Sequence, residues 1–305
     1  MDEQSKNPEI AAEQAPVKPK KLKRHFFLAV IGIALLLMIL GQLLGNLIEL
    51  PLVLLKPDLG GQWRFLLDYF SFIGIDLLVL CYCKLAEKDL LRSFGSAGKG
   101  GSFGNTGKNF ALGLLFGFGM NGLCILLAWL HGDLHFSVGA FKPLYLLLGL
   151  VCVCVQSGAE ELLCRGYMQG ALSQRYPMWL AIAVNALLFG ALHLANPGVT
   201  VLSVTEVVVI GLALSFVTWK WGSLWMAIGV HTAWNFTQSL LFGLPNSGIV
   251  SEGSFLHLEA ARGSFFYDPG FGIEGALPSV VVSVMLGLAA LFYRRRGGLG
   301  DSEAR

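Results

Sequence analysis

A short polar stretch, Glu160-Glu161-Leu-Leu-Cys-Arg165, follows a long apolar run over residues 144–155. Charged groups at membrane depth cost about 2.5–3.5 kcal/mol each at a helix centre, unless they are paired, reach water or do chemistry. Glu161 and Arg165 have the i, i+4 spacing, with the acid first, that favours an ion pair on a helix. Glu160 points about 100° away from Glu161 on a helix and has no cation at helical spacing. The pattern therefore predicts a structural role for Glu161 and a general-base role for Glu160.

Two histidines and an asparagine on later apolar segments are the other candidates for chemistry. His193 lies near the end of one segment, and His231 and Asn235 are spaced i, i+4 on another, so these two share a helix face. A turn at residues 176–177 lies midway between Glu160 and His193. If both arms of this hairpin are helical, we expect these two side chains to face each other ~25 Å along the helices from the turn. We therefore predict that four polar side chains from three helices converge inside the membrane.

The composition identifies a membrane protein. Of the 305 residues, 54% are hydrophobic and 14% are charged, whereas soluble domains carry about 25% charged residues. A spanning helix needs about 20 mostly apolar residues, so we predict an all-α, polytopic membrane protein with about eight transmembrane helices. The expected helices cover residues 26–47, 65–85, 110–130, 143–173, 178–194, 199–219, 224–241 and 277–292.

These helices divide the chain into consecutive segments. Residues 1–24 should form a disordered basic tail, residues 25–140 the first three transmembrane helices, and residues 141–243 a core of helices four to seven that holds the candidate residues. Residues 244–275 should form an external loop, and residues 276–305 the last helix with a basic tail. Lys and Arg gather in the segments that this arrangement places inside, which predicts that both termini are cytoplasmic. We expect the chain to reside in a bacterial cytoplasmic membrane.

In this order, the three motifs resemble those of the CPBP family (CAAX protease and bacteriocin-processing, or Abi), which includes the type II CAAX prenyl endopeptidases. The resemblance covers residues 141–243. It rests on Glu-Glu-x-x-x-Arg ending at Arg165, Phe-x-x-x-His ending at His193, and His-x-x-x-Asn ending at Asn235. Each motif alone is unspecific, but the ordered set is specific. The resemblance implies an intramembrane endopeptidase that hydrolyses a peptide bond in a membrane-anchored or lipidated protein or peptide.

The resemblance also implies a role for each motif residue. The implied catalytic residues are Glu160, His193, His231 and Asn235, and the implied supporting residues are Glu161 and Arg165. In this assignment Glu160 activates water with the help of His193. His231 and Asn235 then hold the oxyanion of the tetrahedral intermediate.

Two mechanisms stay open on the sequence. In the first, the catalytic set acts directly on water and needs no cofactor. In the second, Glu160, His193 and His231 ligate Zn²⁺. The chain has no His-Glu-x-x-His motif, which excludes a standard zincin. Because asparagine is a poor zinc ligand but a good oxyanion donor, Asn235 favours the first mechanism.

Rival functions differ in the patterns that they require. A transporter can also use intramembrane carboxylates, but it often shows internal repeats and broken helices, and the sequence shows neither. A catalytically silent family member that acts as an immunity or scaffold factor is a further alternative. We expect membrane lipids and a membrane-anchored or lipidated peptide as partners, and no nucleic acid, since topology explains the basic clusters at 18–24 and 294–296. Glu206, outside the motifs, is expected to face a cavity or to make a structural hydrogen bond, with a role towards the substrate as the alternative.

Overall fold

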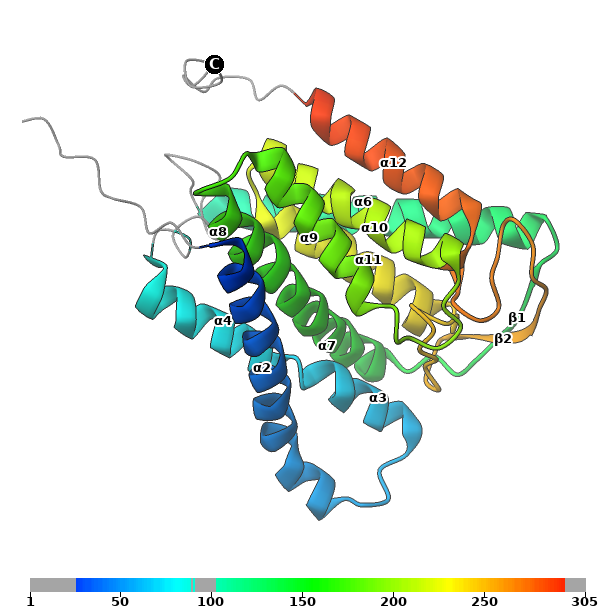
Figure 1. Cartoon of the computed structure of the whole chain (residues 1–305). Coiled ribbons are helices and arrows are strands. Elements are labelled where there is room, and N and C mark those ends of the chain that lie inside the picture. The colour runs from blue at the N-terminus through cyan, green and yellow to red at the C-terminus, as the bar shows by residue number, and fades with distance from the viewer. Residues whose placement is uncertain (1–25, 89, 91–102, 294–305) are drawn as a thin grey trace, which may run out of the picture.

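Helices build most of the part of the chain that the structure describes. The computed structural model describes residues 26–88, 90 and 103–293 (Figure 1). The predicted all-α, polytopic architecture is confirmed. The tail predicted over residues 1–24 and the basic cluster at 294–296 lie outside the described residues.

The helix bounds follow the apolar runs of the sequence. The α-helices are α2 (Phe27–Leu55), α3 (Gly61–Phe70), α4 (Ile73–Ala86), α6 (Phe103–Leu130), α7 (Pro143–Glu161), α8 (Gln169–Ser173), α9 (Met178–Leu192), α10 (Val201–Phe216), α11 (Leu224–Phe236) and α12 (Leu277–Phe292). Three of them continue into π-helical turns, η2 (Leu162–Met168), η3 (Val217–Trp221) and η4 (Thr237–Leu241). A single 3-10 turn, η5 (Ile273–Gly275), precedes α12.

The second expected helix, over residues 65–85, is interrupted. It begins earlier, at Gly61, and breaks at Ser71 between α3 and α4. The Ser71 hydroxyl donates to the Asp68 carbonyl oxygen at 2.7 Å and accepts from the Gln42 side chain at 2.6 Å. Such side-chain bonds compete with the helical hydrogen-bond ladder. The apolar pattern did not reveal this break, which places Asp68 at the wall of an internal cavity.

Five helical stretches among the described residues are long and apolar enough to cross a membrane. They are Phe27–Leu55, Gly61–Ala86, Thr106–Leu130, Pro143–Ser173 and Val201–Trp221, while Met178–Leu192 and Leu277–Phe292 are shorter apolar helices. Large apolar side chains of α2, including Leu36 and Leu47, are exposed on the outside of the bundle, as expected for side chains that face lipid. The chain is an integral membrane protein.

The helices that carry the candidate residues form the centre of the bundle. Helix α11 packs along α6 and α7, and α9 packs against α10. Helix α2 packs against α4, and Figure 1 shows these two helices on the side of the bundle opposite α12. Helices α6 and α11 approach closely at Gly117, where a Cβ atom would collide with the Val230 carbonyl oxygen. This contact fixes the position of α11 directly beside His231.

A small sheet and a long loop close one end of the bundle. Strand β1 (Leu134–Val138) pairs antiparallel with β2 (Leu256–Ala261), and the sequence pattern did not predict this pairing. The buried Asp133 carboxylate accepts hydrogen bonds from His131, Arg262 and Ser264, which ties the end of α6 to the loop. The segment 244–275 is therefore more than an external loop, because it also contributes residues to the cavity wall. Its side of the membrane stays a prediction.

Candidate active site

Glu160 lies at the last turn of α7 with its carboxylate at the wall of a cavity. Its side chain is 22% exposed. Gln156, one turn earlier, donates from Nε2 to Glu160 Oε1 at 2.6 Å. No Lys or Arg among the described residues forms an ion pair with this carboxylate. Glu160 is thus held by an amide and keeps a carboxylate oxygen available to the cavity, as the sequence predicted for the freer of the two acids.

Glu161 is fully buried and accepts from two cationic or potentially cationic groups. Arg165 Nη1 donates to Glu161 Oε1 at 2.9 Å, and neither side chain is exposed. The ion pair predicted from the i, i+4 spacing is therefore present. The Arg165 guanidinium also donates to the Gly211 carbonyl oxygen at 3.2 Å and lies 4.4 Å from the centre of the Phe189 ring. Arg165 thereby connects the end of α7 to α9 and α10.

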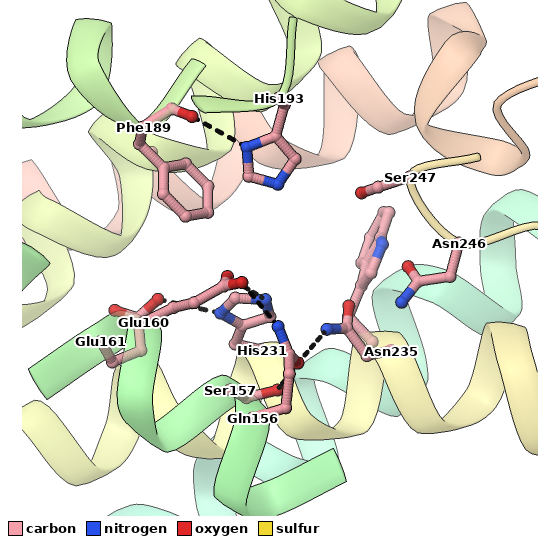
Figure 2. A network of polar contacts seen from close by, with 12 residues as sticks. Gln156, Ser157, Glu160, Glu161, Phe189, His193, His231, Asn235, Asn246 and Ser247 are labelled. Carbon is pink, nitrogen blue, oxygen red and sulfur yellow. Dashed lines mark hydrogen bonds and ion pairs between the residues drawn. The ribbon is translucent and has the colours of Figure 1, made fainter. Parts of the chain in front are cut away.

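The His231 imidazole lies between the two carboxylates. Its Nδ1 is 2.9 Å from Glu161 Oε1, and its Nε2 is 3.6 Å from Glu160 Oε2 (Figure 2). A carboxylate oxygen thus lies near each nitrogen of the ring. Glu161 is therefore a brace for His231 as well as the partner of Arg165, a second contact that the sequence did not predict.

Asn235 lies one helical turn beyond His231 on α11. Its Nδ2 donates to Gln156 Oε1 at 3.0 Å. An amide nitrogen carries two N–H donors, so this bond leaves one donor for another acceptor. Gln156 thus joins Glu160 on α7 to Asn235 on α11 through the two ends of one amide. Sequence reasoning missed Gln156, although its i, i+4 spacing to Glu160 was a signal that could have found it.

His193 caps the end of α9, on the far side of the cavity from His231 (Figure 2). Its Nδ1 is 2.8 Å from the Phe189 carbonyl oxygen, which leaves Nε2 available to the cavity. No hydrogen bond or ion pair joins Glu160 to His193, both of which the structure describes. Both side chains line the same cavity, and their direct facing across the hairpin stays a prediction. The helix of His193 ends beside the cavity, and the imidazole next to Glu160 is that of His231.

The four predicted catalytic side chains share one cavity of about 790 Å³. The convergence predicted from helix spacing is therefore observed. Most of the lining is apolar, including Met38 and Leu43 of α2 and Ile210 of α10. Other polar lining residues include Gln156 of α7 and, from more distant segments, Tyr69, Asn246, Ser247 and Glu274. Loop residues such as Ser247 reach the cavity through long-range folding, for which sequence spacing carries no signal.

The side chains that could hold a metal are arranged loosely. Among the described residues, no three His, Cys, Asp or Glu side chains form a group that could hold a metal ion. Nδ1 of His193 is occupied by Phe189 and Nδ1 of His231 by Glu161, which leaves Nε2 of each ring as the nitrogen that could bind an ion. Zinc ligation by Glu160, His193 and His231 would require these side chains to draw together around the ion.

A family model matches this core. Residues 142–237 match the family described as type II CAAX prenyl endopeptidase Rce1-like. The chain is 28% identical over 156 residues to the uncharacterized protein YyaK of Bacillus subtilis, a match that spans about half of each chain (50% of this one and 49% of the relative). No solved structure gives a significant match. The matched segment contains all three motifs, so the resemblance to the CPBP family of CAAX-type proteases is confirmed.

Proposed function

We propose that this chain is an intramembrane endopeptidase that hydrolyses a peptide bond in a membrane-anchored or lipidated substrate. The observation that carries the proposal is the position of the Glu160 carboxylate. It borders an apolar cavity, next to the His231 imidazole and across from His193. An Rce1-like match over residues 142–237 supports a peptidase of the CAAX type. A membrane-associated substrate fits a cavity whose apolar lining includes α2.

In the proposed reaction, Glu160 takes a proton from a water molecule held between Glu160 and His193. The resulting hydroxide attacks the carbonyl carbon of the scissile peptide bond and forms a tetrahedral oxyanion. The proton on Glu160 then passes to the leaving nitrogen, the C–N bond breaks, and the products are a carboxylate and an amine. General-base catalysis of this kind contributes about 10²- to 10⁴-fold to the rate.

The oxyanion would be held by two donors on α11. His231 would donate from Nε2, because Nδ1 is occupied by Glu161 and the 3.6 Å between Nε2 and Glu160 Oε2 is too long for a hydrogen bond. Asn235 donates through the N–H that is not bonded to Gln156. Losing one donor of an oxyanion site typically costs about 10²- to 10³-fold in rate. The network behind these donors, from Arg165 through Glu161 to His231, would keep them aligned.

We favour a mechanism without a metal, and chelation tests it. Glu160, His193 and His231 would be the ligands of a Zn²⁺ ion, which would polarise the attacking water if bound. We expect dialysis against a strong chelator to leave peptide cleavage unchanged, as measured with purified protein in detergent. Loss of cleavage on chelation, with recovery when zinc is restored, would contradict the metal-free mechanism and leave the peptidase proposal intact.

Hydrolysis itself can be tested by isotope labelling. Purified protein in detergent is incubated in H₂¹⁸O with a mixture of apolar, lipidated and unlipidated peptides, and the products are analysed by mass spectrometry. We expect paired fragments in which the new C-terminus carries ¹⁸O. The matched variant is His193→Ala, which should release the fragments far more slowly. Equal fragment release by this variant would assign the cleavage to a contaminant and contradict the proposal. A silent or transport function instead predicts no fragments from either protein.

A further inference from the structure

The cavity contains a second acidic region that the proposed reaction does not use. Glu206 of α10 and Glu274 of η5 both line the cavity, and they are 1% and 6% exposed. No Lys or Arg among the described residues forms an ion pair with either side chain. Buried carboxylates are normally paired with a cation because an isolated buried charge is costly. Two such groups in one cavity therefore need a separate explanation.

Glu206 has an unused acceptor. Its Oε1 accepts from the Ser283 hydroxyl of α12 at 3.0 Å. Its Oε2 is buried and has no hydrogen-bond partner in the protein. A buried oxygen without a partner costs about 1–3 kcal/mol. A purely structural role in joining α10 to α12 would need only the bond to Ser283, and a neutral side chain would serve it.

Glu274 is held in place by neutral donors. Its Oε1 accepts from the Trp234 indole nitrogen at 3.0 Å, and its Oε2 accepts from the Ser247 backbone nitrogen at 2.5 Å and hydroxyl at 2.9 Å. Burial raises the pKa of Glu274, and the hydrogen bonds from Ser247 and Trp234 lower it without reversing that shift. Trp234 directly precedes Asn235, so Glu274 is fixed to the same helix as the proposed oxyanion donors. This acidic region therefore adjoins the reaction site.

The cavity as a whole is acidic. Its lining includes the carboxyl groups of Asp68, Glu160, Glu206 and Glu274 and no Lys or Arg side chain, with His193 and His231 as the only basic groups among the described lining residues. His231 already lies between Glu160 and Glu161. The acidic groups thus outnumber the bases available to neutralise them. A cavity lined by one sign of charge concentrates ligands of the other sign.

We propose that Glu206 and Glu274 form a subsite for a cationic group of the substrate, such as a lysine side chain or a free amino group. The proposal rests on the proposed function only in calling the ligand a substrate. An ammonium group offers up to three N–H donors, which suits the free oxygen of Glu206, and its positive charge would favour the ionised form of both carboxyl groups. The substrate class is then an apolar, membrane-associated peptide that carries a positive charge close to the scissile bond.

Binding of matched peptides tests the subsite without requiring hydrolysis. The protein is the full-length chain with Glu160→Gln in neutral detergent, and the probes are short fluorescent apolar peptides with one lysine placed at each position in turn. At one position we expect the lysine peptide to bind at least about tenfold more tightly than its norleucine counterpart. A 6-hydroxynorleucine peptide, which donates without a charge, should bind like the norleucine peptide.

Substitutions then assign the preference to the two carboxylates. Glu206→Gln and Glu274→Gln should each reduce the preference for lysine over norleucine from roughly tenfold to about twofold or less, because the ammonium group loses one of its two charged partners. Glu259→Gln is the matched control, because it removes an exposed carboxylate of β2 outside the cavity. This control should keep the full preference. A merely structural role would weaken binding of all three peptides equally.

Two results would overturn the subsite. One is equal binding of the lysine and norleucine peptides at every position, a comparison that needs no substitution in the subsite. The other is a lysine preference that survives both glutamine variants, or that the hydroxyl peptide reproduces. The subsite and the peptidase proposal can fail separately. A lysine preference without hydrolysis by the unsubstituted protein would contradict the proposed function alone, and hydrolysis without any lysine preference would contradict the subsite alone.

Discussion

Gln156→Met removes the amide that joins the two halves of the candidate site. The Gln156 side chain donates to Glu160 Oε1 at 2.6 Å and accepts from Asn235 Nδ2 at 3.0 Å. Ser157 also donates to Gln156 Oε1, at 3.2 Å. Methionine has nearly the same length and volume but offers neither an N–H nor a carbonyl oxygen. The substitution therefore tests positioning while it preserves packing.

The expected loss of activity follows from the bonds that break. A hydrogen bond to a charged acceptor contributes about 1.5–3 kcal/mol. If the Gln156–Glu160 bond holds the carboxylate in its reactive orientation, its loss should lower kcat roughly ten- to hundredfold. Release of Asn235 adds to this loss, although the two effects share one side chain and need not sum. KM should change little, because Gln156 acts through other residues rather than through the bulk of the substrate.

The assay compares kcat, KM and thermal unfolding in detergent for two variants. Gln169→Met is the matched control. Gln169 is also buried, and its side chain donates a hydrogen bond to the Ser215 carbonyl oxygen, but it does not line the cavity. The control should lower the unfolding temperature and leave kcat of the folded protein unchanged. A wild-type kcat for Gln156→Met would refute the reasoning that this amide positions Glu160 and Asn235.

Two further predictions concern the supports of the site and of the loop. Arg165→Met removes the arginine partner of the buried Glu161 and leaves the His231 imidazole as its remaining partner. The free energy of unfolding should fall by about 3–5 kcal/mol in denaturant titrations, and adding Glu161→Gln should restore part of it. If the single variant unfolds like the wild type, the ion pair contributes no stability. At Asp133, burial favours the neutral acid, but hydrogen bonds from Ser264, His131 and Arg262 outweigh it and hold the pKa below the usual value of 3.8. The charged form therefore stabilises the loop above pH 3.8, and this stabilisation is lost as the pH falls through the lower folded-state pKa. Protease cleavage within the loop should become faster in that acidic range, and Asp133→Asn should show the same increase at neutral pH. A cleavage rate that does not change on acidification would contradict this role of Asp133.

The sequence predicted the features that are determined by residue spacing within one helix or one hairpin. Apolar runs located the helices, because a segment that crosses lipid must be apolar for about 20 residues. The i, i+4 spacing predicted the Glu161–Arg165 ion pair, and the common spacing of His231 and Asn235 placed both on one wall of the cavity. These features depend on a single helix or on a short hairpin, so a linear pattern is enough to find them.

Contacts that depend on packing between distant segments could not be predicted from residue spacing. The imidazole next to Glu160 belongs to His231 rather than to His193, because the crossing of α7 and α11 decides which ring enters between the carboxylates. Ser247 and Glu274 reach the cavity from a long loop whose path no periodicity describes. Gln156 belongs to both groups. Its i, i+4 spacing to Glu160 can be read from the sequence, but its contact with Asn235 on α11 cannot.

Glu160→Ala tests the central claim most directly. The measurement is the initial rate of reporter-peptide cleavage in detergent, with Glu161→Ala as the paired variant and thermal unfolding as the check on folding. We expect Glu160→Ala to lower the rate by at least about 10²-fold, the lower bound for a general base, while its unfolding temperature stays close to that of the wild type. Glu161→Ala should lower both, because it leaves Arg165 unpaired in the interior. Cleavage by folded Glu160→Ala at the wild-type rate would contradict the account.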